Sequence, residues 1–491
     1  MVFYSTRSEK LTADSARAVL AGLAPDGGLY TPLDFGSMQV DIARLLTLEP
    51  AELFAEIVAK ILPDFGENEI KRLVPEAYAG KFATDEITPL KKVGDTFVLE
   101  LFRGPTSAFK DVALSVLPRL ISLAREQLGV KEETVILTAT SGDTGKAALE
   151  GFRDVPGTRI IVFYPEGGVS DIQHMQMATQ RGENVRVCAV KGNFDDAQTG
   201  VKLIYADDEK AHWAKSSGVR LSSANSINIG RLAPQAAYYF KAYCDLVRAG
   251  EIKNGEKINF AVPTGNFGNI LAGEFARRMG LPVGRLICAS NANNVLTDFI
   301  LTGVYDRRRP FFRTASPSMD ILVSSNLERY LLLAGGSFGL VAALMGELRE
   351  KGVYRAPQSL TDEMKRHFDA GWADDTRALE TIGRVWREHG YLLDPHTAVA
   401  WKVNEDVKAR NGDDTKTVVL STASPYKFGF DVLSAVSGGQ ANTGFEAMDR
   451  LSEFTGVPVP GNLAELRNMT PRFSDCVEKT QMLAYVKEAL R

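Results

Sequence analysis

Residue types that bind metals or form disulfide bonds are scarce in this sequence. Its 491 residues include only four cysteines and five histidines. The cysteines are widely scattered without a CxxC pair, and the histidines lack the HxxxH spacing that is typical of zinc ligands. We therefore expect neither a disulfide framework nor a metal site, and we interpret the cysteines as reduced, buried thiols.

The sequence also has no strong excess of charge and no long apolar run. Its formal net charge is −4 with both signs interspersed, which argues against nucleic acid or an anionic membrane surface as the main partner. The most apolar stretch, from Tyr330 to Gly346, is broken by glycines and short for a bilayer span, so we expect buried helix and turn there. The first residues turn polar too early for a signal peptide. We expect a cytoplasmic protein.

What the sequence does contain is enough length for two or three domains and an alternation of strands and helices. Residues up to about 90 show mixed structure with helical patches. From about residue 95 onward, short β-branched runs alternate with helical stretches, a pattern that builds parallel sheets through right-handed crossovers. Ligand sites in such sheets lie beyond the carboxyl ends of the strands.

The expected strands are Thr134–Thr138, Arg159–Tyr164, Asn184–Val190, Val219–Ser222, Lys257–Val262 and Lys416–Leu420. The expected helices are Gly145–Phe152, Ala197–Tyr205, Arg231–Ala249 and Ile270–Met279.

A glycine-containing loop follows one of these strands. Residues 263–269 read PTGNFGN and precede a helix. Two glycines let the backbone approach an anion, and free amides at a helix N-terminus favour a phosphate. The loop is neither a Walker loop nor a GxGxxG turn, which argues against a nucleotide-binding protein. The alternative is an ordinary βα turn with asparagine as the helix cap.

One lysine stands among small and apolar neighbours at the start of a helix. Lys110 lies in the segment GPTSAFKD, residues 104–111. Burial near a helix N-terminus disfavours the ammonium form, which suits Schiff-base chemistry. A single lysine in a turn is more often a solvated surface residue, so this interpretation depends on the motifs that accompany it.

Three polar segments accompany the lysine. In TATSGDTG (138–145) the hydroxyls of Thr140, Ser141 and Thr144 can bind a carboxylate, although one such residue alone would be a helix cap. In NSINIGR (225–231), Arg231 can bind a phosphate monoester, or it can be a surface group. In STASP (421–425) a hydroxyl can face a pyridine nitrogen, unless the segment is only a turn.

Taken in order, these motifs resemble the β-family of pyridoxal-phosphate enzymes, known as fold type II. Within that family the chain is similar to the longer class of threonine synthases, which occurs in enteric bacteria and fungi. Three further segments carry this closer resemblance, namely YSTR (4–7), GLAPDGGLY (22–30) and DPHTA (394–398). The likeness extends in the right order from about residue 2 to about residue 430.

The resemblance implies a role for each motif. Lys110 would hold the cofactor, pyridoxal 5'-phosphate, and shuttle protons. The cofactor phosphate would be bound by Gly265, Asn266, Phe267, Gly268 and Asn269. Thr422 would face the pyridine nitrogen, and Asp143 would lie beside the cofactor ring. Thr140, Ser141 and Thr144 would surround the substrate carboxylate. Asn225, Ser226 and Arg231 would hold the substrate phosphate.

Three positions depart from the family pattern. The family often has histidine where Ser424 stands and Trp-Ala where Ile229 and Gly230 stand, and shorter-class relatives carry asparagine in place of Asp143. These departures flank the expected ligands without removing them. They bear on the detailed substrate contacts and not on the cofactor.

The activity implied is the conversion of O-phospho-L-homoserine and water into L-threonine and phosphate by γ-elimination and β-addition, the last step of threonine biosynthesis. The alternative enzyme is a phospho-lyase on the same scaffold that releases 2-oxobutanoate. The alternative from another class is a non-catalytic protein that binds a phosphometabolite.

The fold implied is α/β, with two doubly wound α/β domains and a smaller N-terminal domain. We expect the N-terminal domain at residues 1–90, the large cofactor-binding domain at 91–125 and 232–491, and the small α/β domain at 126–231. We expect a monomer or homodimer whose partner is the small-molecule substrate, with no nucleic acid and no membrane.

Overall fold

The larger of two parallel sheets lies at the centre of the computed structural model, which describes residues 1–140, 142–206 and 217–490. Its strand order is β14-β11-β10-β15-β5-β4, and only the edge strand β4 is antiparallel to its neighbour. The strands are β4 (Leu90–Val93), β5 (Thr96–Glu100), β10 (Ile258–Pro263), β11 (Val283–Ser290), β14 (Phe368–Trp372) and β15 (Thr417–Ser421).

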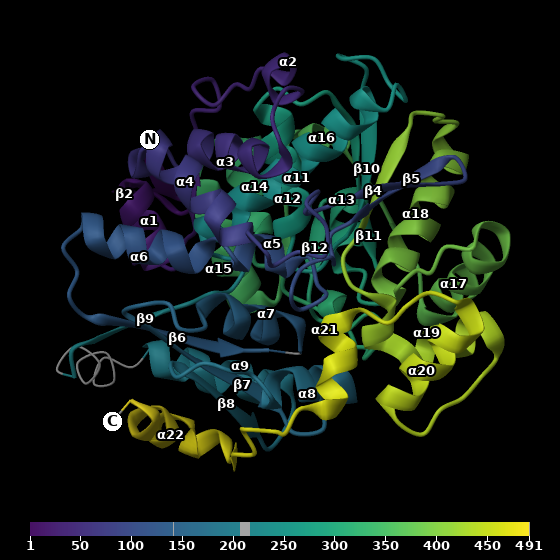
Figure 1. Ribbon diagram of the computed structural model, residues 1–491. Coiled ribbons are helices and arrows are strands. Elements are labelled where there is room, and N and C mark those ends of the chain that lie inside the picture. The colour runs from purple at the N-terminus through teal and green to yellow at the C-terminus, as the bar shows by residue number, and fades with distance from the viewer. Residues whose placement is uncertain (141, 207–216, 491) are drawn as a thin grey trace.

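A second, fully parallel sheet lies beside the first (Figure 1). Its order is β16-β8-β7-β6-β9, and its strands are β6 (Glu133–Ala139), β7 (Thr158–Pro165), β8 (Val185–Val190), β9 (Val219–Ser222) and β16 (Cys476–Val477). The helices around it are α7 (Asp143–Phe152), α8 (Asp171–Ala178), α9 (Phe194–Ala206) and α22 (Met482–Ala489).

The C-terminal segment, which we expected in the large domain, contacts the small sheet. β16 pairs with β8, and Met482 and Val486 of α22 are buried in the apolar cluster of the small sheet. Figure 1 shows α22 beside this sheet. A two-residue strand carries almost no sequence signal, and its position depends on tertiary pairing. The expected domain limits stay a prediction.

The N-terminal region forms a small antiparallel sheet covered by helices. The sheet contains β1 (Phe3–Ser5), β2 (Ser8–Ala13) and β3 (Tyr30–Pro32). The helices are α1 (Ser15–Ala21), α2 (Ile42–Leu45), α3 (Pro50–Ile61) and α4 (Glu67–Tyr78). Helix α3 packs on the central helix α11 (Ile229–Arg248), so this region covers the large sheet from one side.

The α/β fold and the six expected strands are confirmed. The apolar stretch from Tyr330 onward forms helices α14 (Leu327–Gly335) and α15 (Phe338–Lys351), which separate at Gly336 with φ 64°. In the described part of the chain, no helix has the length and apolar character needed to cross a membrane.

The other helices are α5 (Lys110–Leu114), α6 (Leu117–Gln127), α12 (Gly268–Arg278), α13 (Val295–Thr302), α16 (Gln358–His367), α17 (Asp375–His389), α18 (Pro395–Asn411), α19 (Gly429–Ser437), α20 (Gly444–Thr455) and α21 (Gly461–Ala464). A two-stranded antiparallel sheet of β12 (Val304–Asp306) and β13 (Val353–Arg355) lies outside the two large sheets.

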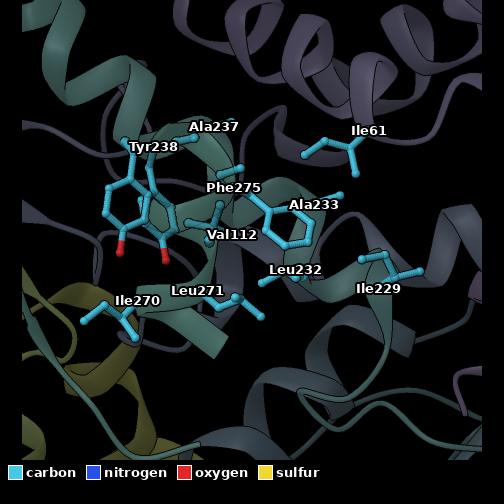
Figure 2. Close-up of a cluster of buried hydrophobic side chains, with 14 of the residues drawn as sticks. Ile61, Val112, Ile229, Leu232, Ala233, Ala237, Tyr238, Ile270, Leu271 and Phe275 are labelled. Atoms are coloured by element: carbon cyan, nitrogen blue, oxygen red, sulfur yellow. The ribbon is translucent and has the colours of Figure 1, made fainter. Parts of the chain in front are cut away.

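Helix α11 is the centre of the main hydrophobic core. It is buried on nearly all sides, as expected of a core helix. Figure 2 shows Leu232 and Ala233 of α11 close to Val112 of α5 and to Leu271 and Phe275 of α12. Helices α5 and α12 follow directly on the lysine motif and the glycine-containing loop. The apolar packing of α11 therefore fixes where both motifs lie.

We expect Leu232→Ala to lower the stability of the folded chain by about 3 kcal/mol, because it removes a buried side chain and leaves a cavity between α5, α11 and α12. Urea unfolding followed by circular dichroism measures this effect. Leu301→Ala is the control, since that side chain is 45% exposed on α13. An equal loss in both variants would contradict the central role of α11.

Candidate active site

The expected site residues lie at the carboxyl ends of neighbouring strands. In the large sheet, β10, β15 and β5 are adjacent and parallel, so the loops that follow them meet at one edge. These loops contain Gly265, Thr422 and Lys110 respectively. The loop after β6 of the small sheet brings Asp143 to the same place, 3.6 Å from the Lys110 amine.

The loop before Lys110, residues 101–109, forms hydrogen bonds with segments more than three hundred residues later in the chain. Phe109 N–H donates to Thr422 O at 2.8 Å, and Ser424 N–H donates to Ser107 O at 3.1 Å. Ser107 has a left-handed backbone with φ 58°. Its hydroxyl accepts a hydrogen bond of 2.9 Å from Asn462 Nδ2, which also donates to Pro105 O. These bonds hold a strained turn just before Lys110.

The Lys110 amine is buried and faces few polar groups. It donates to Ser318 Oγ at 3.2 Å and lies 4.7 Å from the centre of the Phe109 ring. Burial lowers the pKa of Lys110 to about 8, with Arg231 and Lys427 acting in the same direction and Asp143 opposing them. A fraction of the amine is therefore neutral near physiological pH, as a nucleophile or base requires.

Asp143 bridges two lysines. Its Oδ2 faces Lys110, and its Oδ1 accepts from Lys427 Nζ at 2.6 Å and from Gln173 Nε2 at 2.9 Å. Burial by itself would raise the pKa of Asp143, but Lys427 and Lys110 outweigh burial and hold it well below its ordinary value. Sequence reasoning did not find Lys427. The only local signal was its position between two aromatic residues, Tyr426 and Phe428.

The glycine-containing loop presents a row of free amides. Within the described residues, none of the backbone N–H groups from Gly265 to Ile270 donates a hydrogen bond. The carbonyls point elsewhere: Gly265 O accepts from Ser324 Oγ at 3.0 Å, and Asn266 O accepts from Asn326 N–H at 3.0 Å. Phe267 has φ 62°, which turns the loop into α12. This donor set fits a phosphate group.

The space above Gly265 leaves no room for a side chain. A Cβ at Gly265 would lie 2.8 Å from the carbonyl oxygen of Ser318. Ser318 also donates its N–H to His396 Nε2 at 3.3 Å, while His396 Nδ1 pairs with Asp394 at 2.7 Å. Ser318 was not expected from the sequence. It belongs to a long loop whose closeness to Lys110 depends on tertiary contacts.

Asn269 directs its side chain toward α11. Its Oδ1 accepts hydrogen bonds from the hydroxyls of Tyr238 and Tyr239. Its Nδ2 is buried without a hydrogen-bond partner. The loop and the central helix are therefore joined by polar as well as apolar contacts.

Arg231 lies in the first turn of α11 and is 3% exposed. Its Nη1 donates to Ala224 O at 3.0 Å, whereas its Nε is buried without a partner. Burial lowers the pKa of Arg231 to about 10, so the group stays charged at neutral pH. No carboxylate among the described residues pairs with it. A buried, unpaired guanidinium is costly unless an anion binds there.

The loop before Arg231 adjoins the glycine-containing loop. Asn225 and Ser226 are half-buried, and Ser226 Oγ lies 3.4 Å from Ser325 Oγ. A Cβ at Gly268 would lie 3.6 Å from Ser226 Cβ. Fully buried Arg329 joins the surrounding segments, because it donates to Ile227 O, Asn326 Oδ1 and Tyr30 O. The two loops therefore lie side by side.

The remaining expected residues differ in burial and in their hydrogen-bond partners. Thr140 Oγ1 accepts from Gly142 N–H at 3.0 Å and from Gly145 N–H at 2.9 Å, so it caps α7. Thr144 is half-buried on the first turn of α7. Ser141 lies outside the described residues. Thr422 is buried, and the hydroxyl of nearby Ser424 is buried without a partner.

Three family models match consecutive parts of the chain. Residues 86–423 match the model of pyridoxal-phosphate dependent enzymes. Residues 2–78 match the threonine synthase N terminus, and residues 397–486 match the threonine synthase C-terminal model. Together these matches span both sheets and the N-terminal region, so the resemblance predicted from the motifs is confirmed.

Known proteins give the same result. Threonine synthase of Pseudomonas aeruginosa is 39% identical over 432 residues, which cover 87% of this chain and 89% of that protein. Threonine synthase-like 1 of Homo sapiens is 38% identical over 460 residues, 90% of this chain, but the chain spans only 61% of that protein's length.

A solved structure of threonine synthase from Brucella melitensis with bound pyridoxal phosphate matches with a TM-score of 0.86 and 36% identity over the full length of both chains. The yeast enzyme matches with a TM-score of 0.88 and 34% identity, covering 100% of this chain and 98% of that one. The free amides after β10 and the buried amine of Lys110 fit pyridoxal phosphate as cofactor. The chain belongs to the threonine synthase family of pyridoxal-phosphate-dependent, fold type II enzymes.

Proposed function

We propose that the chain converts O-phospho-L-homoserine and water into L-threonine and phosphate. The observation that supports this substrate best is the buried guanidinium of Arg231, which has no carboxylate partner in the described structure. It lies in the first turn of α11, directly after the loop that adjoins the free amides of residues 265–270. One anion site suits the cofactor phosphate, and the second suits a substrate that carries its own phosphate.

In this proposal, bound pyridoxal phosphate supplies an electron sink for charge at the substrate's α carbon. Lys110 removes the α proton, which its partly neutral amine can do near physiological pH. A further proton leaves the β carbon and phosphate leaves the γ carbon. The γ carbon then gains a proton, and water adds its hydroxyl at the β carbon. Reprotonation then gives threonine.

The loops divide the binding tasks. Amides of Gly265, Asn266, Phe267, Gly268 and Asn269 would hold the cofactor phosphate, and the Thr422 hydroxyl would face the pyridine nitrogen. Thr140, Ser141 and Thr144 surround the substrate carboxylate. Asn225, Ser226 and Arg231 hold the substrate phosphate and stabilise its departure, a task for prepositioned donors in a buried site. A cytoplasmic location and a monomeric or homodimeric state stay predictions.

The central test is a product assay. Purified protein loaded with pyridoxal phosphate and given O-phosphohomoserine should form threonine and inorganic phosphate in equal amounts, and Lys110→Ala should form neither. Release of phosphate with 2-oxobutanoate and without threonine would contradict the synthase and support the phospho-lyase. A wild-type protein that takes up no cofactor would support the non-catalytic alternative.

Arg231→Met should reduce kcat/KM for O-phosphohomoserine about 10²- to 10³-fold, because it removes a buried, charge-assisted donor to the substrate phosphate. Steady-state kinetics measure the change. Arg285→Met is the matched control, since Arg285 pairs with Asp369 near the opposite end of β11. Equal rates for Arg231→Met and the wild type would remove Arg231 from the substrate site.

Gly265→Ala should weaken binding of pyridoxal phosphate about tenfold or more, equivalent to about 1.4 kcal/mol. The added methyl group would lie 2.8 Å from the Ser318 carbonyl oxygen, so the loop must shift and its amides lose their alignment. Titration of the apoprotein with cofactor, followed by visible absorbance, gives the Kd. Gly346→Ala on α15 is the control because a Cβ there meets nothing within 4 Å.

A further inference from the structure

A second lysine lies in the same buried cluster as Lys110. Lys427 is in the short 3-10 helix Pro425–Phe428 that follows β15, and its side chain is 0% exposed. Its ammonium lies 2.6 Å from Asp143 Oδ1 and donates to Thr106 O at 3.1 Å. A fully buried lysine is rare in proteins unless it is paired, as Lys427 is here. The function proposed above assigns it no task.

The geometry of Asp143 connects this lysine to Lys110. One carboxylate oxygen faces Lys427, and the other faces Lys110 at 3.6 Å and Ser318 Oγ at 3.4 Å. Gln173 Nε2 donates to the same oxygen as Lys427 does. Two donors therefore fix the Oδ1 atom of the carboxylate, and its Oδ2 atom faces the Lys110 amine.

The charges of the cluster determine how Asp143 affects the protonation of the Lys110 amine. A buried carboxylate acting alone on a neighbouring amine would stabilise the ammonium and keep it protonated. Lys427 supplies one positive charge to the same carboxylate, so Asp143 and Lys427 together carry no net charge. The pair then presents Lys110 with a hydrogen-bond acceptor of fixed direction but not with an uncompensated anion.

We propose that Lys427 is a positioning residue whose ammonium compensates the Asp143 carboxylate, so that Asp143 orients the Lys110 amine without holding a proton on it. This inference rests on the proposed function only in taking Lys110 as the residue that reacts with the cofactor. It does not depend on which substrate follows.

Other ionisable groups around the cluster are held by their own partners. Arg231 acts on Lys110 from the side of α11. Asp111 accepts hydrogen bonds from Thr106 N–H and Oγ1 at 2.8 and 2.5 Å. His396 faces Ser318 through Nε2 and Asp394 through Nδ1. The Lys427 charge also acts on Asp111, where it opposes the rise in pKa that burial causes. Within the described residues Lys427 forms an ion pair with Asp143 and with none of these three groups, so replacing Lys427 changes one charge while their hydrogen bonds stay in place.

The neutral fraction of the Lys110 amine can be read directly from its reaction with pyridoxal phosphate. Full-length protein freed of cofactor by dialysis against cysteine is mixed with pyridoxal phosphate, and the growth of the visible band gives the rate at each pH from about 6 to about 10. The rate rises with pH as the amine loses its proton, and we expect a midpoint near pH 8 for the wild type, where burial places the pKa of Lys110.

The variants should move this midpoint in opposite directions. Lys427→Met leaves Asp143 uncompensated and should raise the midpoint by about one pH unit, so that the rate near neutral pH falls about tenfold. Asp143→Asn leaves the Lys427 charge alone and should lower the midpoint. The double variant D143N/K427M removes both charges and should return the midpoint toward the wild-type value.

Lys241→Met is the matched control. Lys241 is also buried, at 1% exposure, and is ion-paired with Asp245, but it lies on α11 away from Lys110. It should leave the midpoint unchanged even if it lowers the melting temperature. If Lys241→Met moved the midpoint as far as Lys427→Met does, loss of any buried lysine would shift it by lowering stability. That result would overturn the proposal.

An unmoved midpoint in Lys427→Met would also overturn it and leave Lys427 a purely structural residue. If Lys427→Met does not fold, the comparison of Asp143→Asn with the double variant still decides, because the double variant must have the higher midpoint. These measurements use the cofactor alone. A protein that shows the predicted shifts but forms no threonine would retain this inference and lose the proposed function. A protein that forms threonine but shows no such shifts would retain the proposed function and lose this inference.

Discussion

The packing of α11 is the constraint on which the site depends. Nearly every residue of this helix is buried, and α5 and α12 pack directly against it. The close approach of α12 requires Gly273, since a Cβ there would lie 2.8 Å from the Tyr239 ring. Lys110, Arg231 and the free amides near Gly268 are all at the starts of these three helices. Because protein interiors are close-packed, the helix starts cannot move independently of the core.

The site carries more buried positive charge than its own carboxylates compensate. Arg231 has no ion-pair partner among the described residues, and Arg329 donates only to carbonyl and amide oxygens. Phosphate groups of the cofactor and of the proposed substrate would supply the missing anions. Binding of these ligands is therefore coupled to the stability of the surrounding loops, since each bound anion would offset the electrostatic cost of burying these guanidinium groups.

Local sequence was sufficient to locate the motifs but not their partners. The loop from Gly265 to Asn269 and the segment around Lys110 were recognisable because strand, turn and helix signals surround them. Lys427, Ser318 and Asn462 were not found, because each acts through contacts with residues more than a hundred positions away.

The same limit applies to the fold. Six strands rich in β-branched residues were predicted, whereas β5, β11 and β14 were not. β14, with the sequence FDAGW, is a strand only through its pairing with β11. The position of β16 in the small sheet is another tertiary effect. Sequence patterns report local preference, and edge strands and buried ion pairs depend on the assembled structure.

The support of the lysine turn by Asn462 has a consequence for biogenesis. Ser107 and Asn462 are separated by 355 residues, a distance that a ribosome covers in about 20 to 70 s at about 5–20 residues per second. During that interval the turn before Lys110 lacks the side chain that steadies it. The turn can therefore be completed only after residue 462 has been synthesised, so a shorter nascent chain would offer the cofactor a less rigid Lys110.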